Sequence, residues 1–256
     1  MAALKIALEI LSPLLLTKHE DGEKIFDLWQ KYLPGLLPDR YGYCEPIDHP
    51  FDSRDIETAL NGWRWSFFAL KKKPAVEASI FKRKVTQRLH AAWHITADVG
   101  AASQAELITF LKMASIALQA DFSCLHLLTQ SELQRGRASG VVAPLDKQAT
   151  KLHFRIVSRQ LQERIPDLFW ATVFGSPYVG MFGRDYLLSA PAFSTESLSN
   201  ETVLLQTTEK LTDVERRPDV FNEARSRIKA HLGQDAFFRT DDTGDRSYRT
   251  PQFKFE

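Results

Sequence analysis

The sequence contains few of the residues on which several protein classes depend. Only two of its 256 residues are cysteines, Cys44 and Cys124. Two cysteines are too few for a disulfide framework or a cysteine-rich zinc site, and they fit free thiols in a reducing compartment. Lys and Arg number 33 against 32 for Asp and Glu, which leaves a net charge of +1. Such a balance provides no long-range field that would attract a nucleic acid or an acidic membrane surface.

Long apolar runs are also missing. No stretch reaches the roughly 18 apolar residues that a membrane-spanning helix needs. The first sixteen residues, MAALKIALEILSPLLL, are similar to a signal peptide, but Lys5 and Glu9 interrupt the apolar run and no small-residue cleavage site follows. We therefore interpret this run as a strand of the folded protein, and we expect a cytoplasmic protein without membrane contact.

The spacing of apolar residues predicts both strands and helices. Alternation or short apolar runs predict strands over Leu4–Ile10, Arg88–Val99, Asp121–Thr129 and Glu201–Gln206. Helical spacing predicts helices over residues 25–33, 56–59, 103–118, 154–165 and 218–232. The most secure of these begins with a capping box of Ser103 and Glu106. The pattern predicts an α+β fold, with a mixed, largely antiparallel sheet packed with amphipathic helices.

The length of 256 residues is at the upper limit of one compact domain. The polar segment Gln130–Gln148 contains Gly136, Gly140 and Pro144, which is typical of a loop. The chain is therefore expected to be either a single domain over residues 1–256 or two similar packed α/β halves, at about residues 1–140 and 141–256.

Several patterns imitate catalytic or metal sites. His90 and His94 would be metal ligands on a helix, but on the predicted strand they lie roughly 13 Å apart. Ser79 and Lys82 match a Ser-x-x-Lys motif without its partner motifs. The glycines of the segment 175–180 lack the Lys-Ser/Thr that follows in a phosphate loop. We predict neither a metal nor a cofactor.

A faint nuclease-like pattern occurs near residue 220. Asp219, Glu223 and Arg225 are similar to the acidic pair and base of restriction-type nucleases, in which carboxylates hold a divalent metal. On an amphipathic helix these charges are typical of a solvated face. No nucleophile and base stand out elsewhere, so we predict a protein without catalytic residues. The alternative is a small cytoplasmic hydrolase with a carboxylate and histidine pair that the fold brings together.

Two stretches of the sequence are rich in aromatic residues. Trp63 and Trp65 would share one face of an extended chain, which indicates either a recognition surface or a packed strand that continues to Phe67. The segment 169–193 combines Gly175, Gly180 and Gly183 with bulky aromatic residues and almost no charge. We expect this second stretch to be a buried corner around which the chain is organised.

The second stretch also carries a family resemblance. The resemblance spans residues 168–238 and rests on Phe174–Val179, Phe182-Gly183, Leu187–Ala192 and Ile228–Leu232. These motifs resemble immunity protein 52 of bacterial polymorphic-toxin systems, over about the last third of the chain, and Trp63-Arg64-Trp65 is compatible with it. The resemblance implies an effector–immunity pair in bacterial competition, in which the protein binds and neutralises a cognate toxin. It further implies that the toxin is a restriction-endonuclease-like nuclease delivered by a type VI or contact-dependent system.

Such a partner would present a cationic cleft for DNA, so carboxylates on the immunity protein would complement it. The best acidic cluster is Asp241, Asp242 and Asp245, and a second consists of Asp213, Glu215 and Asp219. The candidate partner-binding residues are Asp241, Asp242, Asp245, Asp213, Glu215, Trp63 and Trp65. The same carboxylates are also typical of ordinary loop and helix-end charges. The sequence leaves the oligomeric state open.

Overall fold

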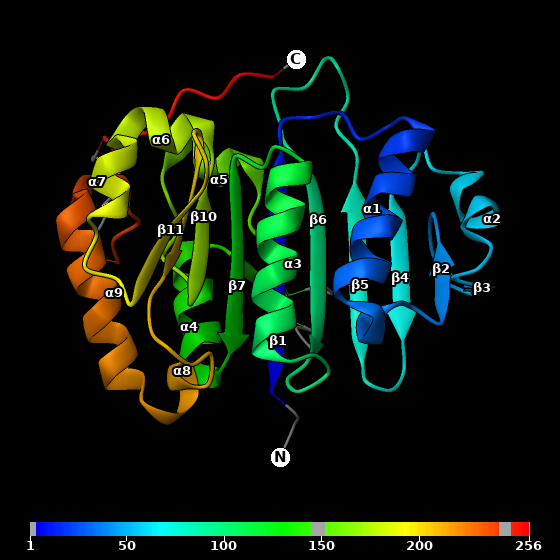
Figure 1. The fold of residues 1–256 in the computed structure, drawn as a ribbon, viewed down its shortest axis with the longest axis horizontal. Coiled ribbons are helices and arrows are strands. Elements are labelled where there is room, and N and C mark those ends of the chain that lie inside the picture. Colours follow the sequence, from blue (N-terminus) through cyan, green and yellow to red (C-terminus); the bar gives the residue numbers. More distant parts are fainter. Residues whose placement is uncertain (1–3, 145–151, 241–246, 256) are drawn as a thin grey trace. The chain divides into compact units, whose positions relative to one another are not determined.

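The structure is a computed structural model that describes residues 4–144, 152–240 and 247–255. Contacts between Cα atoms divide the chain into two units, one of Met1–Leu125 with Lys254–Glu256 and one of His126–Phe253. The border lies inside the strand β7 (Phe122–Leu128) rather than near residue 140. Each unit combines strands with helices (Figure 1), so the predicted α+β class is confirmed.

The strands of the first unit follow the spatial order β7-β1-β6-β5-β4-β2-β3. Every pairing from β1 through to β3 is antiparallel. Their bounds are β1 Lys5–Ser12, β2 Arg40–Gly42, β3 His49–Pro50, β4 Phe67–Lys71, β5 Val76–Phe81 and β6 Ala91–Asp98. The predicted strands at Leu4–Ile10, Arg88–Val99 and Asp121–Thr129 are confirmed as β1, β6 and β7, whereas β2, β3 and β5 were not predicted.

Strand β1 is buried on both faces, although its alternation predicted one buried and one solvated face. Ile6, Leu8 and Ile10 are buried as expected, but the intervening Ala7 and Glu9 are equally inaccessible. Glu9 lies opposite His94 in the register of β1 and β6. The carboxylate is tolerated inside because the imidazole of His94 contacts it, as described below.

Helices cover the face of this sheet that carries Trp93. Figure 1 shows α1 (His19–Tyr32) and α3 (Gln104–Ala117) side by side on that face. The ring centroid of Trp93 lies 5.6 Å from that of Trp29 and 5.0 Å from that of Phe110. The remaining helices of the unit are η1 Pro34–Leu36 and α2 Ile56–Leu60. Aromatic contacts between helix and sheet therefore form the centre of the first core.

The predicted capping box fixes the start of α3. The backbone N–H of Glu106 donates to Ser103 Oγ at 3.2 Å, and the N–H of Ser103 donates to Glu106 Oε2 at 2.7 Å. Helix α1 begins six residues earlier than the predicted residue 25, at His19, because the polar residues after His19 form its exposed first turn. None of the helices in the described ranges combines the length and apolar character that a membrane crossing needs.

The second unit has three antiparallel strands in the order β11-β12-β10 and a separate β8-β9 pair. The strand bounds are β8 Val142–Pro144, β9 Leu152–Phe154, β10 Ala171–Phe174, β11 Ser194–Ser199 and β12 Thr202–Gln206. The helix bounds are α4 Gln130–Ser139, α5 Ser158–Glu163, α6 Ser176–Phe182, α7 Arg184–Leu188, α8 Asp213–Arg216, α9 Pro218–Leu232 and η2 Gln234–Ala236. The predicted strand at Glu201–Gln206 and the helix from Pro218 are confirmed as β12 and α9.

Two predictions for the second unit were wrong. The expected loop Gln130–Gln148 begins with the helix α4, because Thr129 caps it and Gly140, with φ of +82°, ends it. Gly136, which favoured a loop, lies inside α4 where the side chain of Val142 packs against it. The helix predicted over residues 154–165 is restricted to Ser158–Glu163, because Phe154 pairs in β9.

The glycine-rich stretch 169–193 is a strand followed by two short helices. β10 leads through Gly175 into α6, and Gly183, with φ of +90°, separates α6 from α7. Phe174 and Tyr178 are fully buried, as predicted for a buried corner, but Tyr186 is 46% exposed. The helices α6 and α7 pack on β10, β11 and β12, and this packing forms the second core.

Candidate functional site

The two tryptophans singled out in the sequence lie in different environments. Residues 61–64 form a turn, and β4 begins only at Phe67, so the packed strand expected over residues 63–67 is wrong. Trp63 is 2% exposed and donates from Nε1 to the carbonyl of Leu16 at 3.1 Å. Trp65 is 58% exposed. Because the turn rotates the two side chains apart, only Trp65 is accessible to a partner.

The predicted acidic residues are also separated. Asp241, Asp242 and Asp245 lie outside the described residues. Asp213 is buried, and its Oδ2 accepts from the backbone N–H of Lys210 at 3.2 Å, which fixes the chain before α8. Glu215, on the same helix, is exposed. Only Glu215 of this pair offers an accessible carboxylate.

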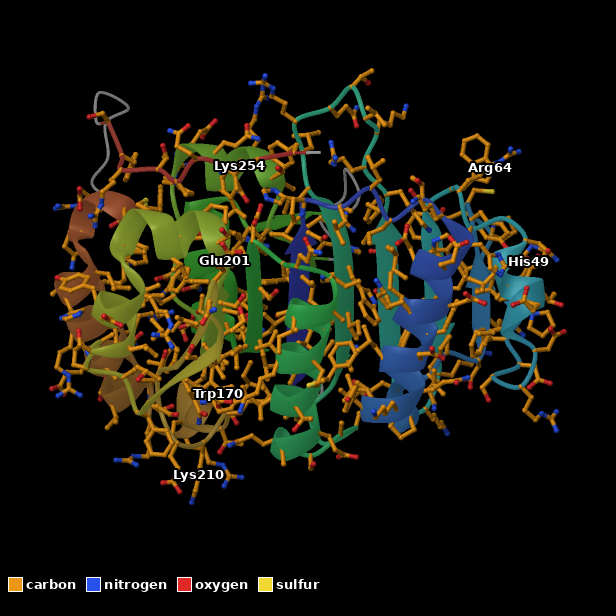
Figure 2. The ribbon with its side chains drawn as sticks, turned by 45° about the horizontal axis from the view of Figure 1, so that its top comes forward. His49, Arg64, Trp170, Glu201, Lys210 and Lys254 are labelled. Atoms are coloured by element: carbon orange, nitrogen blue, oxygen red, sulfur yellow. The ribbon has the colours of Figure 1, made fainter. Side chains whose placement is uncertain are left out.

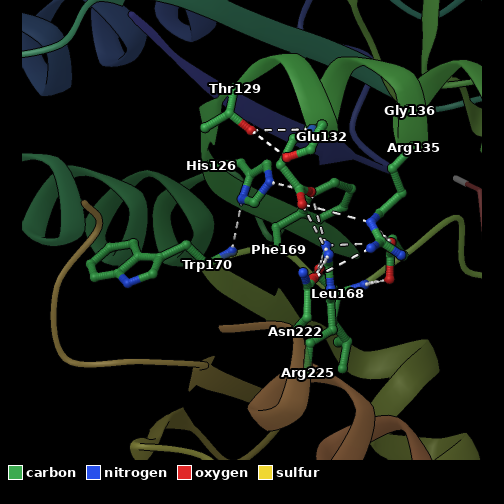
Figure 3. Close-up of polar contacts among 12 residues, drawn as sticks. His126, Thr129, Glu132, Arg135, Gly136, Leu168, Phe169, Trp170, Asn222 and Arg225 are labelled. Atoms are coloured by element: carbon green, nitrogen blue, oxygen red, sulfur yellow. Dashed lines mark hydrogen bonds and ion pairs between the residues drawn. The ribbon is translucent and has the colours of Figure 1, made fainter. Parts of the chain in front are cut away.

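The densest cluster of charged side chains lies inside the second unit, where no site was predicted. Figure 3 shows Glu132, from the first turn of α4, meeting Arg225 of α9. Arg225 Nη1 lies 2.9 Å from Glu132 Oε2, and Arg225 Nη2 lies 3.0 Å from Glu132 Oε1. This is a bidentate pair, the strongest geometry for an arginine and a carboxylate. We call Glu132, Arg225, Asp167, Lys229 and Arg135 the ion network.

Asp167 is the second carboxylate of the ion network. Its Oδ1 accepts from the backbone N–H of Leu168 at 2.8 Å and from Lys229 Nζ at 3.0 Å. Its Oδ2 lies 3.5 Å from Arg225 Nη1 and 4.0 Å from Arg135 Nε. Burial would raise the pKa of Asp167, but the charges of Arg225 and Lys229 outweigh it and lower the pKa.

His126 contacts Glu132 of the ion network, and its hydrogen bonds define its tautomer. The backbone N–H of Trp170 donates to His126 Nδ1 at 3.1 Å, which makes Nδ1 an acceptor. The proton is therefore on Nε2, which donates to Glu132 Oε2 at 2.9 Å (Figure 3). Burial would raise the pKa of Glu132, but the hydrogen bond from His126 and the contacts of Arg225 outweigh it and hold the pKa well below its usual range.

The local sequence positions these groups accurately. Thr129 Oγ1 accepts from the backbone N–H of Glu132 at 3.2 Å, so the N-terminal cap of α4 also sets the position of the carboxylate. Arg225 lies on the buried face of α9 between Phe221 and Ile228. The prediction that Arg225 belongs to a solvated face with Asp219 and Glu223 was wrong for Arg225. Its partner Glu132 is 93 residues away, and no spacing rule detects such a pair.

A cleft of about 440 Å³ borders the ion network. Arg135, Asp167 and Lys229 belong both to the network and to the cleft wall. The side chain of Arg135 is 44% exposed and that of Lys229 is 15% exposed. The ion network is therefore continuous from buried Arg225 to cations that a molecule in the cleft would contact.

Two separate polar groups lie in the first unit, and each contains one of the two histidines that the sequence pattern had singled out. His94 Nδ1 lies 2.9 Å from Glu9 Oε1, and His94 Nε2 lies 2.9 Å from Thr96 Oγ1. His90 instead contacts Asp121, with Nε2 3.0 Å from Oδ2. The two histidines bind different carboxylates.

One group of described residues has spacing compatible with a cation. His19, Glu23 and Glu57, from α1 and the start of α2, bring one ligand atom each within 4.8 Å of one another. His19 Nε2 lies 3.1 Å from Glu57 Oε2 and 3.9 Å from Glu23 Oε1. These side chains are largely exposed, so the geometry is that of a surface ion pair joining α1 to α2.

Both cysteines are free thiols, as the sequence predicted, and Cys124 is buried while Cys44 is exposed. Burial, followed by the nearby charge of Glu9, raises the pKa of Cys124 well above its usual value, which keeps this thiol unreactive. No protein-family model and no curated protein matches the sequence.

Proposed function

We propose that this protein is an immunity protein that binds a cognate secreted antibacterial toxin and neutralises it by covering a functional surface. The resemblance of residues 168–238 to immunity protein 52 supports this proposal and favours a restriction-endonuclease-like nuclease as the toxin. Such a protein functions by recognition, so its determinants are accessible anchor side chains on a rigid base.

The observation that carries the proposal is the exposed pair of Arg64 and Trp65. The Arg64 guanidinium lies 5.2 Å from the centroid of the Trp65 ring, and Trp65 is 58% exposed. Figure 2 shows Arg64 pointing away from the ribbon of the first unit. Tryptophan and arginine are the residues most enriched among those that dominate binding energy in protein interfaces. The exposed ring of Trp65 offers a large apolar surface that a partner can bury.

The base of this pair is rigid. The backbone N–H of Trp65 donates to the carbonyl of Gly62 at 3.0 Å, and the N–H of Gly62 donates to Tyr43 Oη at 3.0 Å. Trp63 anchors the same turn in the core through its bond to Leu16. A rigid anchor loses little conformational entropy when a partner binds, which favours tight association.

Two exposed apolar residues lie in a loop at the same end of the sheet as this pair. Phe67 pairs with Ile80 in the register of β4 and β5, so the turn before β4 and the loop after β5 lie at the same end of these two strands. That loop exposes Val85 by 73% and Leu89 by 39%. We define the binding surface as Arg64, Trp65, Val85 and Leu89.

Replacing Trp65 with alanine is expected to weaken toxin binding about 30-fold, equal to roughly 2 kcal/mol, because the anchor is lost. The measurement is co-expression with the product of the adjacent gene, scored by growth rescue and co-purification, followed by titration of the purified pair. Phe193→Ala is the matched control, because Phe193 is 57% exposed in the second unit. Equal affinities of the two variants would contradict the binding surface, and a neighbouring product that neither arrests growth nor co-purifies would contradict the immunity function.

A hydrolase is the second candidate, and the group of Thr96, His94 and Glu9 favours it. With Nδ1 of His94 donating to Glu9, Nε2 accepts from the Thr96 hydroxyl, and this order of hydroxyl, imidazole and carboxylate is the one that activates a nucleophile. If this function holds, the purified protein hydrolyses simple aryl esters, and Thr96→Val removes the activity while His90→Gln retains it. Equal rates for the wild type and Thr96→Val would exclude this group as a catalytic site.

A further inference from the structure

A second cleft of about 470 Å³ adjoins the cleft beside the ion network. Gln234 and Arg239 line both. The first cleft is bordered by Arg135 and Lys229, and the second by Tyr248. Volumes of several hundred Å³ are typical of sites for small molecules. The two clefts together therefore provide a cationic end and an aromatic end within the second unit.

Among the described residues of the ion network, the cationic end carries a surplus of positive charge. Three cations of the ion network, Arg135, Arg225 and Lys229, surround two carboxylates, Glu132 and Asp167. His126 adds no charge, because its Nδ1 accepts from the backbone of Trp170. Arg239 also lines the wall of this cleft. A surplus of positive charge at the border of a cleft attracts an anion.

The carboxylates do not cancel this surplus from within the cleft. Both oxygens of Glu132 contact Arg225, and the oxygens of Asp167 are directed at Leu168, Lys229 and Arg225. The side chain of Asp167 is 7% exposed, compared with 44% for Arg135. Arg135 Nη2 donates to Asn222 Oδ1 at 3.3 Å, and the half-exposed guanidinium borders the cleft, where it can donate to a phosphate.

The aromatic end has two rings held by one arginine. The Arg164 guanidinium lies 4.9 Å from the Phe238 ring centroid and 5.7 Å from the Tyr248 ring centroid. Phe238 lines the first cleft and Tyr248 the second. Asp235 also borders the second cleft, and Arg249 Nε lies 3.6 Å from its Oδ2, which balances its charge. Rings supported in this way suit a planar heterocycle, because base stacking on an aromatic side chain tolerates any base.

We propose that these adjoining clefts bind a mononucleotide. Its phosphate contacts Arg135 and Lys229, and its base lies toward Phe238 and Tyr248. This site shares no residue with the binding surface of Arg64 and Trp65, so its test does not depend on the immunity function.

The test is isothermal titration of the full chain with the four ribonucleoside monophosphates, inorganic phosphate and adenosine. At least one mononucleotide is expected to bind with a Kd below about 1 mM, and inorganic phosphate and adenosine are each expected to bind at least about tenfold more weakly. Arg135→Gln is expected to weaken that mononucleotide about tenfold or more. Arg227→Gln is the matched control, because Arg227 is 61% exposed and pairs only at 3.8 Å with Glu223 on the same helix.

Two results would overturn the proposal. The first is the absence of binding by all four mononucleotides at about 5 mM, well above the expected Kd. The second is equal affinity of Arg135→Gln and Arg227→Gln for the bound mononucleotide, with both variants shown by circular dichroism to be folded. Inorganic phosphate that binds as tightly as the mononucleotide would overturn the contact of the base with the rings.

Discussion

Replacing Arg225 with methionine is expected to lower the free energy of unfolding by about 3–5 kcal/mol. Methionine retains an unbranched apolar stem, so the change mainly removes the guanidinium. Arg225 is 3% exposed and supplies both hydrogen bonds of the bidentate pair with Glu132 as well as the 3.5 Å contact with Asp167. Without it, two carboxylates inside the second unit lose their shared cation, and each keeps a large desolvation cost.

The measurement is urea unfolding of the variant beside Arg227→Met. Arg227 is on the same helix, but it is 61% exposed and pairs with Glu223 at 3.8 Å, so its removal is expected to cost about 0.5 kcal/mol or less. The double variant Arg225→Met with Glu132→Leu is expected to recover at least about half of the loss, because it removes the uncompensated charge as well. If Arg225→Met and Arg227→Met unfold at the same urea concentration, the ion network does not stabilise the second unit.

Elements with local end signals were predictable from the sequence. The capping box of Ser103 and Glu106 fixed the start of α3, and Pro218 and Gly233 marked the ends of α9. Both signals depend on residues a few positions apart, which a single sequence reveals. The clean alternation around Trp93 likewise predicted β6. The sequence therefore predicted those elements whose bounds are set by residues of the element itself or next to it.

Elements and sites defined by distant partners were not predictable. Helix α4 is rich in polar residues and contains Gly136, so its composition favoured a loop, and its burial depends on Val142 and Arg225 from elsewhere in the chain. Arg225 was assigned to the solvated face because charged residues usually lie there. The prediction that Trp63 and Trp65 share one face was wrong for the same reason, because a turn held by the distant Tyr43 rotates the two rings apart. A signal for Arg225 existed, because it continues the apolar stripe of Phe221 and Ile228.

Lys82 is half-buried, and its Nζ is a buried atom for which the described residues provide no hydrogen-bond acceptor. Its Nζ lies 3.6 Å from the centroid of the Trp63 ring and 6.0 Å from that of Phe67. Burial lowers the pKa of Lys82 from 10.5 to about 7. The full shift corresponds to about 5 kcal/mol of cost for the charged form. Attraction of the ammonium by the Trp63 ring offsets about 1–2 kcal/mol of it.

The sign of the pH dependence follows from this lowered pKa. Below pH 7 the lysine is charged in both the folded and the unfolded chain, so folding carries the whole cost of burying the charge. Between pH 7 and 10.5 the folded protein has released the proton while the unfolded chain retains it, and stability rises with pH. Above that range the cost has disappeared. Lys82 therefore destabilises the first unit in acid and at neutral pH, and ceases to do so in alkali.

Replacing Lys82 with methionine is accordingly expected to raise the free energy of unfolding at pH 6 by about 3 kcal/mol, and to leave it nearly unchanged at pH 10. The measurement is urea unfolding of the wild type and of Lys82→Met at pH 6, 8 and 10. Because other groups also titrate in this range, the result is the difference in free energy of unfolding between the two proteins at each pH. Lys84→Met is the control, because Lys84 is exposed two residues further along the same loop and its replacement leaves the pH profile parallel to the wild type. A Lys82→Met profile that is also parallel to the wild type would show that the ammonium is not buried against Trp63, and the rigid base assigned to the binding surface would then lose one of its supports.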